Sequence, residues 1–264
     1  MLLEVKNLTV SYGSKPTVKE ADISLDAGEI LSIVGESGSG KTTVIRAVMG
    51  CLPGNGRVTG GSLVFDGRDL LANTAEEWRA LCGRGMSMIF QDSGNMINPI
   101  RRIGEQFVDY IRAHEPKSSA EEAVRRAEAM LGSVNLPNPD NIMKLYPFEL
   151  SGGMRQRVGI AMAMTFGPKL LLADEPTSAL DVTTQAQIVR QIVDVRNKYN
   201  AAVIIVTHNL GVASYMSNKI MVMKNGEVVE SGPREQIIYS PRHEYTKQLL
   251  SAVPVIGGRQ YGDE

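Results

Sequence analysis

The sequence predicts an α/β fold built around a mainly parallel sheet. Two apolar runs, Lys169–Ala173 and Ala201–Val206, have the length and composition of buried strands, and Thr184–Lys198 between them has the spacing of an amphipathic helix. A third run, Glu29–Val34, leads into a glycine-rich loop and then into helix-forming residues. Strands that alternate with helices pack as a parallel sheet covered on both faces, so these runs predict that arrangement.

The N-terminal segment predicts strands of a half-buried kind. Leu3, Val5, Leu8 and Val10 alternate with polar residues apart from one slip, which is typical of a strand with one face in the core. Further along, Ser62–Phe65 precedes an Asp-Gly turn and predicts another strand.

The middle and the C-terminal part differ in character. Met86–Phe90 predicts a further strand, and the segment from about Asn98 to Phe166 predicts a helical insertion, because stretches such as Ala120–Leu131 combine helical spacing with many charges. Near the C-terminus, Lys219–Met223 and Glu227–Glu230 flank an Asn-Gly pair, which is a strong signal for a two-residue hairpin.

Composition excludes several classes of function. The 264 residues carry a net charge of -1, so charge gives no indication of a nucleic-acid partner. No window approaches the roughly 20 apolar residues of a membrane-spanning helix, and the N-terminus does not resemble a signal peptide. We therefore expect a soluble chain that reaches a membrane only through a partner. Cys51 and Cys82 form no C-x-x-C pair, which favours two reduced thiols over a metal site.

Residues 35–42 read G-E-S-G-S-G-K-T and match the phosphate-binding loop pattern G-x-x-x-x-G-K-[ST] at every position. Glycines let backbone N–H groups surround an anion, and the following helix presents its positive end to the same phosphates. The lysine side chain can reach the β- and γ-phosphates, and the hydroxyl after it can bind Mg²⁺. The alternative is a glycine-rich turn before a helix. The candidate nucleotide-binding residues are Gly35, Ser37, Gly38, Ser39, Gly40, Lys41, Thr42 and Thr43.

Two acids follow the buried run Lys169–Ala173. Asp174 is placed to hold Mg²⁺, directly or through water, and Glu175 to orient or deprotonate an attacking water. The alternative is a pair of helix-capping acids around Pro176.

Residues 150–157, L-S-G-G-M-R-Q-R, resemble the signature motif of ABC ATPases, although Met154 stands where that family usually has glutamine. The resemblance implies that Ser151, Gly152 and Gly153 form a second anion cradle at a helix start. Without the family resemblance, the sequence supports only a helix N-cap role for Ser151. The resemblance covers about residues 2–250. It implies an ABC-type, RecA-like parallel core with an N-terminal antiparallel β-subdomain.

The expected bounds follow from that resemblance. The whole chain, 1–264, would be one ABC ATPase domain, with the core and β-subdomain in about 1–92 and 167–240. The helical subdomain would occupy about 93–166, and a C-terminal extension about 241–264.

The resemblance also assigns roles to residues that, taken one at a time, are only weak evidence for a nucleotide site. Tyr12 would stack on adenine, and Gln91 would contact Mg²⁺ and sense the transporter interface. Residues 178–181 would form the loop that communicates between subunits, with Asp181 at the nucleotide. His208 would hydrogen-bond the γ-phosphate and the water. Two chains would enclose two ATP molecules head to tail, and either the same chain or a paralogue could be the second.

Finally, residues 231–250 resemble the ATPase subunits of bacterial peptide and nickel importers, as do Phe90–Asp92 with the Asn-Pro pair at 98–99. The resemblance implies two membrane permeases, an extracytoplasmic solute-binding protein as an indirect partner, and a location on the cytoplasmic face of the membrane. It implies ATP and Mg²⁺ as cofactors. With no cysteine after Cys82, we expect no iron–sulfur cluster. An importer of another solute, a soluble ABC ATPase outside transport and a non-hydrolysing regulator are the alternatives, and the sequence does not identify the cargo.

Overall fold

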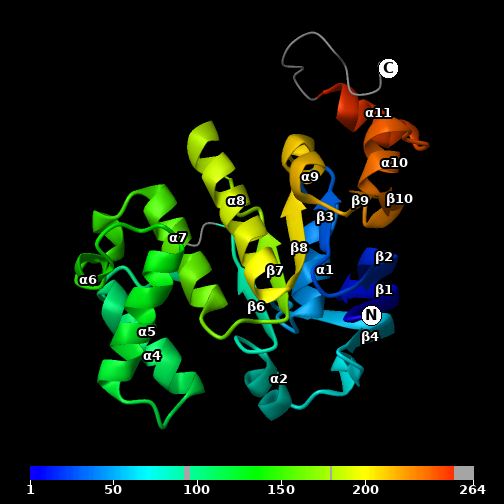
Figure 1. The fold of residues 1–264 in the computed structure, drawn as a ribbon. Coiled ribbons are helices and arrows are strands. Elements are labelled where there is room, and N and C mark those ends of the chain that lie inside the picture. Colours follow the sequence, from blue (N-terminus) through cyan, green and yellow to red (C-terminus); the bar gives the residue numbers. More distant parts are fainter. Residues whose placement is uncertain (92–95, 179, 253–264) are drawn as a thin grey trace. The chain divides into compact units, whose positions relative to one another are not determined.

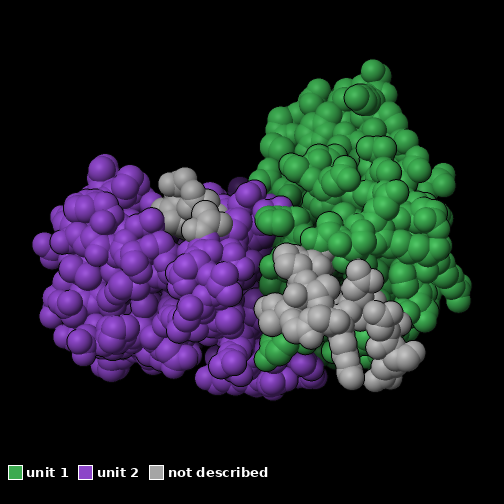
Figure 2. All heavy atoms as spheres, turned by 90° about the horizontal axis from the view of Figure 1, so that it is seen from above, with its two compact units in different colours: residues 1–78, 202–264 green, residues 79–201 purple. Residues whose placement is uncertain are grey.

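The computed structural model describes residues 1–91, 96–178 and 180–252 (Figure 1). These residues belong to two compact units. Unit 1 combines residues 1–78 with 202–264, and unit 2 contains residues 79–201 (Figure 2). Two positions of the predicted motifs, Asp92 and Ala179, lie outside the described residues. So does the last part of the expected C-terminal extension, from residue 253 onward.

Unit 1 contains an antiparallel sheet made from the N-terminal part of the chain. Its strand order is β2-β1-β4-β5, with β1 paired to both β2 and β4. The single slip in the alternation of β1 is a bulge: Asn7 has φ 52° and the register shifts between Val5 and Leu8, which keeps both side chains buried. The strands are β1 (Leu3–Tyr12), β2 (Lys15–Leu25), β4 (Gly56–Phe65) and β5 (Arg68–Asp69).

The other strands of unit 1 form the predicted parallel arrangement. Strand β3 (Ile30–Val34) pairs in parallel with both β8 (Ala202–Thr207) and β9 (Lys219–Lys224). All residues of β3 and β8 are buried, as expected for strands covered on both faces. The predicted Asn-Gly hairpin joins β9 antiparallel to β10 (Glu227–Pro233).

The helices of unit 1 are short and follow the strands. The first, α1 (Lys41–Val48), buries Val44, Ile45 and Val48, which lie on one face. Full burial of each such side chain contributes roughly 1.5–3 kcal/mol to stability. The others are η1 (Leu70–Ala72), α9 (Leu210–Met216), α10 (Arg234–Tyr239) and α11 (Glu244–Ser251), while α2 (Ala75–Leu81) contains the boundary between the units.

Unit 2 is mainly helical and contains one parallel strand pair, β6 (Met86–Ile89) with β7 (Leu170–Asp174). Helix α5 buries Ala123, Ala127 and Leu131, which recur every four residues, and this spacing is the one that predicted a helix there. The helices are α4 (Ile103–His114), α5 (Ala120–Ser133), α6 (Pro139–Ile142), η2 (Pro147–Glu149), α7 (Gly152–Met164) and α8 (Val182–Tyr199). In the part of the chain that the structure describes, no helix has the length and apolar character needed to cross a bilayer.

The α/β class and the parallel pairing are therefore confirmed. The sequence analysis missed β2, whose inward residues Val18, Ala21, Ile23 and Leu25 do not keep a strict period of two. Glu20 has φ 49° at the break, so a bulge hides the alternation. The proposed limits of a helical subdomain, 93–166, are narrower than unit 2, which also holds β6, β7 and α8.

Candidate nucleotide site

The predicted phosphate loop connects the end of β3 to the start of α1. Its backbone accepts only glycine at position 35, where φ is 148° and a Cβ atom would lie 2.1 Å from the carbonyl oxygen of Met223. Because Gly40 is the N-cap of α1, the loop ends where the helix offers its first N–H groups. The local geometry therefore suits an anion at the helix start.

Lys41 is only 5% exposed, and its ammonium group lies against its own loop. Nζ donates to the carbonyl oxygens of Gly35 at 2.8 Å and of Glu36 at 2.6 Å. These contacts compensate the buried charge, since an unpaired buried ammonium is costly. A phosphate group is a stronger acceptor of the same protons.

The hairpin between β9 and β10 supports the loop. The N–H of Gly226 donates to the carbonyl oxygen of Ser39 at 3.1 Å, while its carbonyl oxygen accepts from the N–H of Lys19 at 2.8 Å. Sequence analysis predicted this hairpin but not its contact with the phosphate loop. Tyr245, also missed, contacts the loop at Glu36.

His208 follows β8 at the same sheet edge as the phosphate loop. Val34, the residue before Gly35, pairs with Thr207, the residue before His208. The exposed His208 precedes Asn209, which caps α9 by accepting hydrogen bonds from the N–H groups of the helix. The parallel register thus brings the loop and the histidine to one edge of the sheet.

Tyr12 ends β1 in the other sheet of unit 1 and pairs with Gly56 of β4. The half-buried tyrosine ring lies directly over this glycine, since a Cβ atom at Gly56 would be 2.6 Å from the Cε1 atom of the ring. The ring can lie there only because Gly56 has no side chain.

In unit 2, three of the predicted residues lie at the carboxyl ends of the paired strands β6 and β7. Ile89 pairs with Ala173, so Asp174, the last residue of β7, and Glu175 lie at the same sheet edge as the residues that follow β6, Gln91 among them. Asp174 is 1% exposed. Glu175 is half-buried with φ 42°, a conformation that non-glycine residues adopt at a cost and that is concentrated at functional sites.

The turn after Glu175 bears on the alternative interpretation, in which the two acids cap a helix. The N–H and hydroxyl of Ser178 both donate to the Glu175 carbonyl oxygen, at 3.1 and 3.0 Å. The cap of the next helix, α8, is instead Asp181, whose carboxylate accepts from the N–H and hydroxyl of Thr184 at 2.9 and 2.7 Å. Glu175 is therefore not the cap of α8.

The signature residues lie at the start of α7. Ser151 is the N-cap, and its hydroxyl oxygen accepts from the N–H of Met154 at 3.3 Å. Gly153 lies against the methyl group of Thr184, the same residue that binds Asp181. Unit 2 therefore links the signature motif to the loop that ends at Asp181.

The donor types at the paired strand ends of unit 2 suit Mg²⁺. This cation prefers oxygen ligands, and the Gln91 amide and the Asp174 carboxylate both offer them. In unit 1, the Thr42 hydroxyl is a donor of the same kind. Within the described residues, no group of three or more His, Cys, Asp or Glu side chains lies together as a metal site.

Comparison with known proteins gives the following matches. A family model described as ABC transporter matches residues 18–178, and a model of the oligopeptide/dipeptide transporter C-terminal region matches residues 229–263. The oligopeptide transport ATP-binding protein OppD of Salmonella typhimurium is 45% identical over 96% of this chain and 76% of its own length. The dipeptide transport ATP-binding protein DppD of Lactococcus lactis subsp. cremoris is 40% identical over 97% and 74%.

Among solved structures, the ATP-binding cassette MJ0796, a dimer in a post-hydrolysis state bound to ADP and Pi, is similar with a TM-score of 0.77. It is 27% identical, and the match covers 88% of this chain and 99% of that one.

Proposed function

The chain belongs to the ABC transporter family as an ATP-hydrolysing subunit, and we propose that it drives the import of peptides. The observation that carries the site assignment is the pairing of Val34 with Thr207, which puts the phosphate loop and His208 at one sheet edge. The match of residues 229–263 and the names of the relatives support peptides as the cargo.

ATP would bind with its adenine on Tyr12 and its phosphates in the loop. Backbone N–H groups of residues 38–43 would surround the phosphates, with the positive end of α1 behind them. Lys41 would keep its hydrogen bond to the carbonyl oxygen of Gly35 and turn from that of Glu36 toward oxygens of the β- and γ-phosphates. The ammonium group has three N–H donors, so it can make the loop contact and the phosphate contacts together.

Mg²⁺ would be held by the Thr42 hydroxyl, the Asp174 carboxylate and the Gln91 amide, with the phosphates and water as further ligands. When bound, the ion neutralises negative charge on the phosphates.

Hydrolysis needs a positioned water. Glu175 would accept a proton from this water while the water oxygen attacks the γ-phosphorus atom. The bond from that phosphorus to the ADP oxygen breaks, and ADP and phosphate are the products. His208 would donate to a γ-phosphate oxygen and hold the water in line.

The second half of each site would come from another subunit. Ser151, Gly152 and Gly153 would bind the γ-phosphate of ATP held by the partner's phosphate loop, and Asp181 would lie at the contact between the two. The dimeric state of the similar cassette with ADP and Pi supports this arrangement. The partner can be a second copy or a paralogue.

Two membrane permeases would hold this pair of ATPases on the cytoplasmic face of the membrane. A solute-binding protein outside the membrane would deliver the cargo to the permeases, so the ATPase would contact it only indirectly. Nickel or a metal chelate remains an alternative cargo. ATP hydrolysis by the whole complex in membrane vesicles distinguishes the two cargoes. Stimulation of hydrolysis by peptides supports the proposal, and stimulation by Ni²⁺ alone contradicts it.

The catalytic assignment is tested by Glu175→Gln, with Glu121→Gln on the exposed face of α5 as the matched control. We expect Glu175→Gln to lower turnover roughly a hundredfold or more while ATP binding is retained and an ATP-bound dimer accumulates. Turnover, nucleotide binding and molar mass by light scattering measure the three effects. Near-normal turnover in Glu175→Gln would overturn the assignment.

A further inference from the structure

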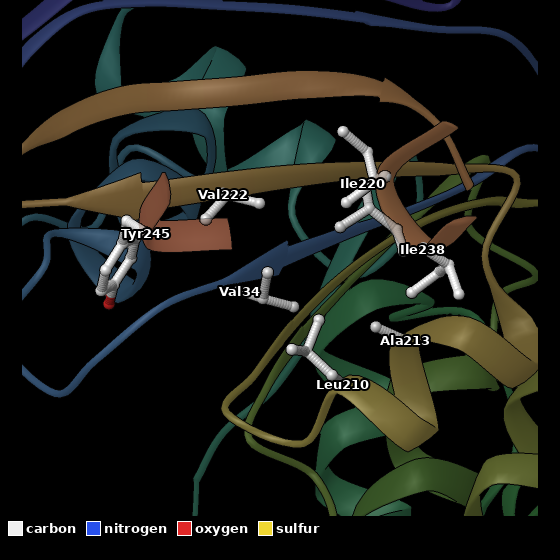
Figure 3. Packing of buried hydrophobic residues seen from close by; sticks show 8 residues of the cluster. Val34, Leu210, Ala213, Ile220, Val222, Ile238 and Tyr245 are labelled. Carbon is white, nitrogen blue, oxygen red and sulfur yellow. The ribbon is translucent and has the colours of Figure 1, made fainter. Parts of the chain in front are cut away.

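The phosphate loop is contacted by a residue that lies more than 200 positions away in the sequence. Tyr245, the second residue of α11, is 4% exposed, and its hydroxyl oxygen accepts a hydrogen bond from the N–H of Glu36 at 3.1 Å. Figure 3 shows the tyrosine next to Val222, with its hydroxyl directed away from the labelled aliphatic residues. The aromatic ring is thus part of the core, and the hydroxyl is the part that reaches the loop.

This hydrogen bond acts on one peptide group, the one that joins Gly35 to Glu36. The carbonyl oxygen of that group accepts from Nζ of Lys41 at 2.8 Å, while its N–H donates to Tyr245. In a trans peptide these two groups point in opposite directions, so Lys41 and Tyr245 hold the same peptide plane from opposite sides. No other orientation of the plane keeps both hydrogen bonds.

Such a peptide group needs to be held. Gly35 has φ 148°, and glycine has no Cβ atom that would prevent the plane from rotating. If the plane turned over, its N–H would face Lys41 and would repel the ammonium group. The Tyr245 hydroxyl therefore selects the orientation in which the loop presents a carbonyl oxygen to the lysine.

Tyr245 is itself held on several sides. The carboxylate of Glu230 accepts from the N–H groups of Arg242 at 2.8 Å and His243 at 3.1 Å, which fixes the start of α11 to β10. The ammonium group of Lys224 lies 4.4 Å from the centre of the tyrosine ring. The ring also packs in one buried cluster with Val34, the residue just before the loop. Few rotamers are open to the side chain, so its hydroxyl is a rigid support.

The hydroxyl stays protonated in this environment. Burial raises the pKa of the Tyr245 phenol, and the nearby charge of Glu36 raises it further, while the Glu36 N–H has the opposite effect. A neutral phenol accepts from the N–H of Glu36 with its oxygen and keeps its own proton.

We propose that Tyr245 is a positioning residue for ATP binding: its hydroxyl holds the Gly35–Glu36 peptide group in the orientation that aims Lys41 at the phosphates. This inference rests on the proposed role of the phosphate loop. It gives the C-terminal segment a part in the nucleotide site, although the segment contains none of the nucleotide-binding motifs.

The test is Tyr245→Phe, which keeps the ring and removes the hydroxyl. We expect the Kd and KM for ATP to rise about threefold to tenfold with kcat changed less than about twofold, the size expected for one hydrogen bond. The exposed Tyr239→Phe on α10 is the matched control and should match the parent chain. The Kd is measured with a fluorescent ATP analogue and Mg²⁺, and thermal unfolding without nucleotide shows whether the variant is folded. An unchanged Kd in folded Tyr245→Phe overturns the inference.

Two further variants make the result specific. Lys41→Ala should abolish ATP binding. If the Lys41→Ala variant binds ATP normally, the proposed site itself is wrong. If Lys41→Ala loses ATP binding while Tyr245→Phe binds ATP normally, only the role of Tyr245 is contradicted. Adding Tyr245→Phe to Glu36→Gln separates the backbone hydrogen bond from the effect of the Glu36 charge on the phenol. A further loss of affinity in the double variant supports the backbone contact, and no further loss contradicts it.

Discussion

The methyl group of Thr184 fills the space in front of Gly153: a Cβ atom at the glycine would lie 2.7 Å from the threonine Cγ2 atom. The hydroxyl of Thr184 donates to Asp181 at 2.7 Å. One side chain of α8 thus contacts the start of α7 with its carbon and its own helix cap with its oxygen.

This contact predicts a rescue experiment. Gly153→Ala should destabilise the chain by about 1–3 kcal/mol, because the added methyl overlaps Thr184 within a packed contact. Gly153→Ala with Thr184→Ser should recover most of that loss, since serine keeps the hydroxyl and lacks the methyl group. Urea unfolding measures both.

Gly152→Ala is the control for that series, since its Cβ atom would meet Leu180 at an ordinary 3.7 Å. If Gly153→Ala is as stable as Gly152→Ala, the close contact between Gly153 and Thr184 does not exist in solution.

The two roles of Asp181 can be separated by substitution. Asp181→Ala removes the N-cap of α8 and should lower the melting temperature, whereas Asp181→Asn keeps a good cap and should melt close to the parent chain. If the carboxylate also acts between subunits, Asp181→Asn should lose ATPase activity while keeping its melting temperature. If Asp181→Ala loses both ATPase activity and thermal stability while Asp181→Asn keeps both, the residue is only a helix cap.

The stacking role of Tyr12 is tested through Gly56. Gly56→Ala would push a methyl group into the tyrosine ring, so we expect the Kd for ATP to rise about twofold to tenfold, the range of one aromatic contact. Gly60→Ala on the same strand is the control, because its Cβ atom would lie 3.5 Å from Thr9. Equal ATP affinity in the two variants would remove the support for adenine at Tyr12.

The attachment of α11 predicts a pH dependence. Burial raises the pKa of Glu230, but its polar neighbours, among them the N–H groups of Arg242 and His243 that donate to the carboxylate, outweigh burial, so the pKa is lowered from 4.5. A carboxylate with a lowered folded-state pKa stabilises the fold above its unfolded value and loses this contribution as the pH falls through the folded one.

Glu230→Gln should therefore lower the free energy of unfolding by about 1–3 kcal/mol at pH 7, with a difference that shrinks below pH 4.5. Glu227→Gln, exposed on the same strand, should show no such trend. Unfolding in urea at several pH values measures it, and a constant difference down to pH 3.5 would contradict the role of the ionised Glu230.

The places of several candidate residues in the fold were predictable because motif chemistry is local. Lys41 and Thr42 follow glycines at a set spacing, and Asp174 ends a buried apolar run, so their places at a helix start and a strand end could be inferred. Parallel pairing supplied the rest, since it brings the ends of neighbouring strands together.

What stayed hidden depends on contacts between distant positions. Tyr245 contacts Glu36 from the other end of the sequence, and Thr184 contacts Gly153 although strand β7 lies between them in the chain, so no periodicity indicates either contact. The strand β2 was missed for a local reason, because a bulge at Glu20 interrupts its alternation. The hydrophobic pattern of a helix or strand indicates which of its faces is buried, but it does not indicate which residues pack against that face.

The contact between Tyr245 and the loop has a consequence for how the family can vary. Because the phenol accepts from a main-chain N–H, nineteen of the twenty amino acids at position 36 supply the same donor, and proline alone does not. Substitutions at that position can therefore accumulate without a compensating change at Tyr245, and correlated substitution would not reveal the pair. We expect proline to be selected against at position 36 wherever the tyrosine is kept.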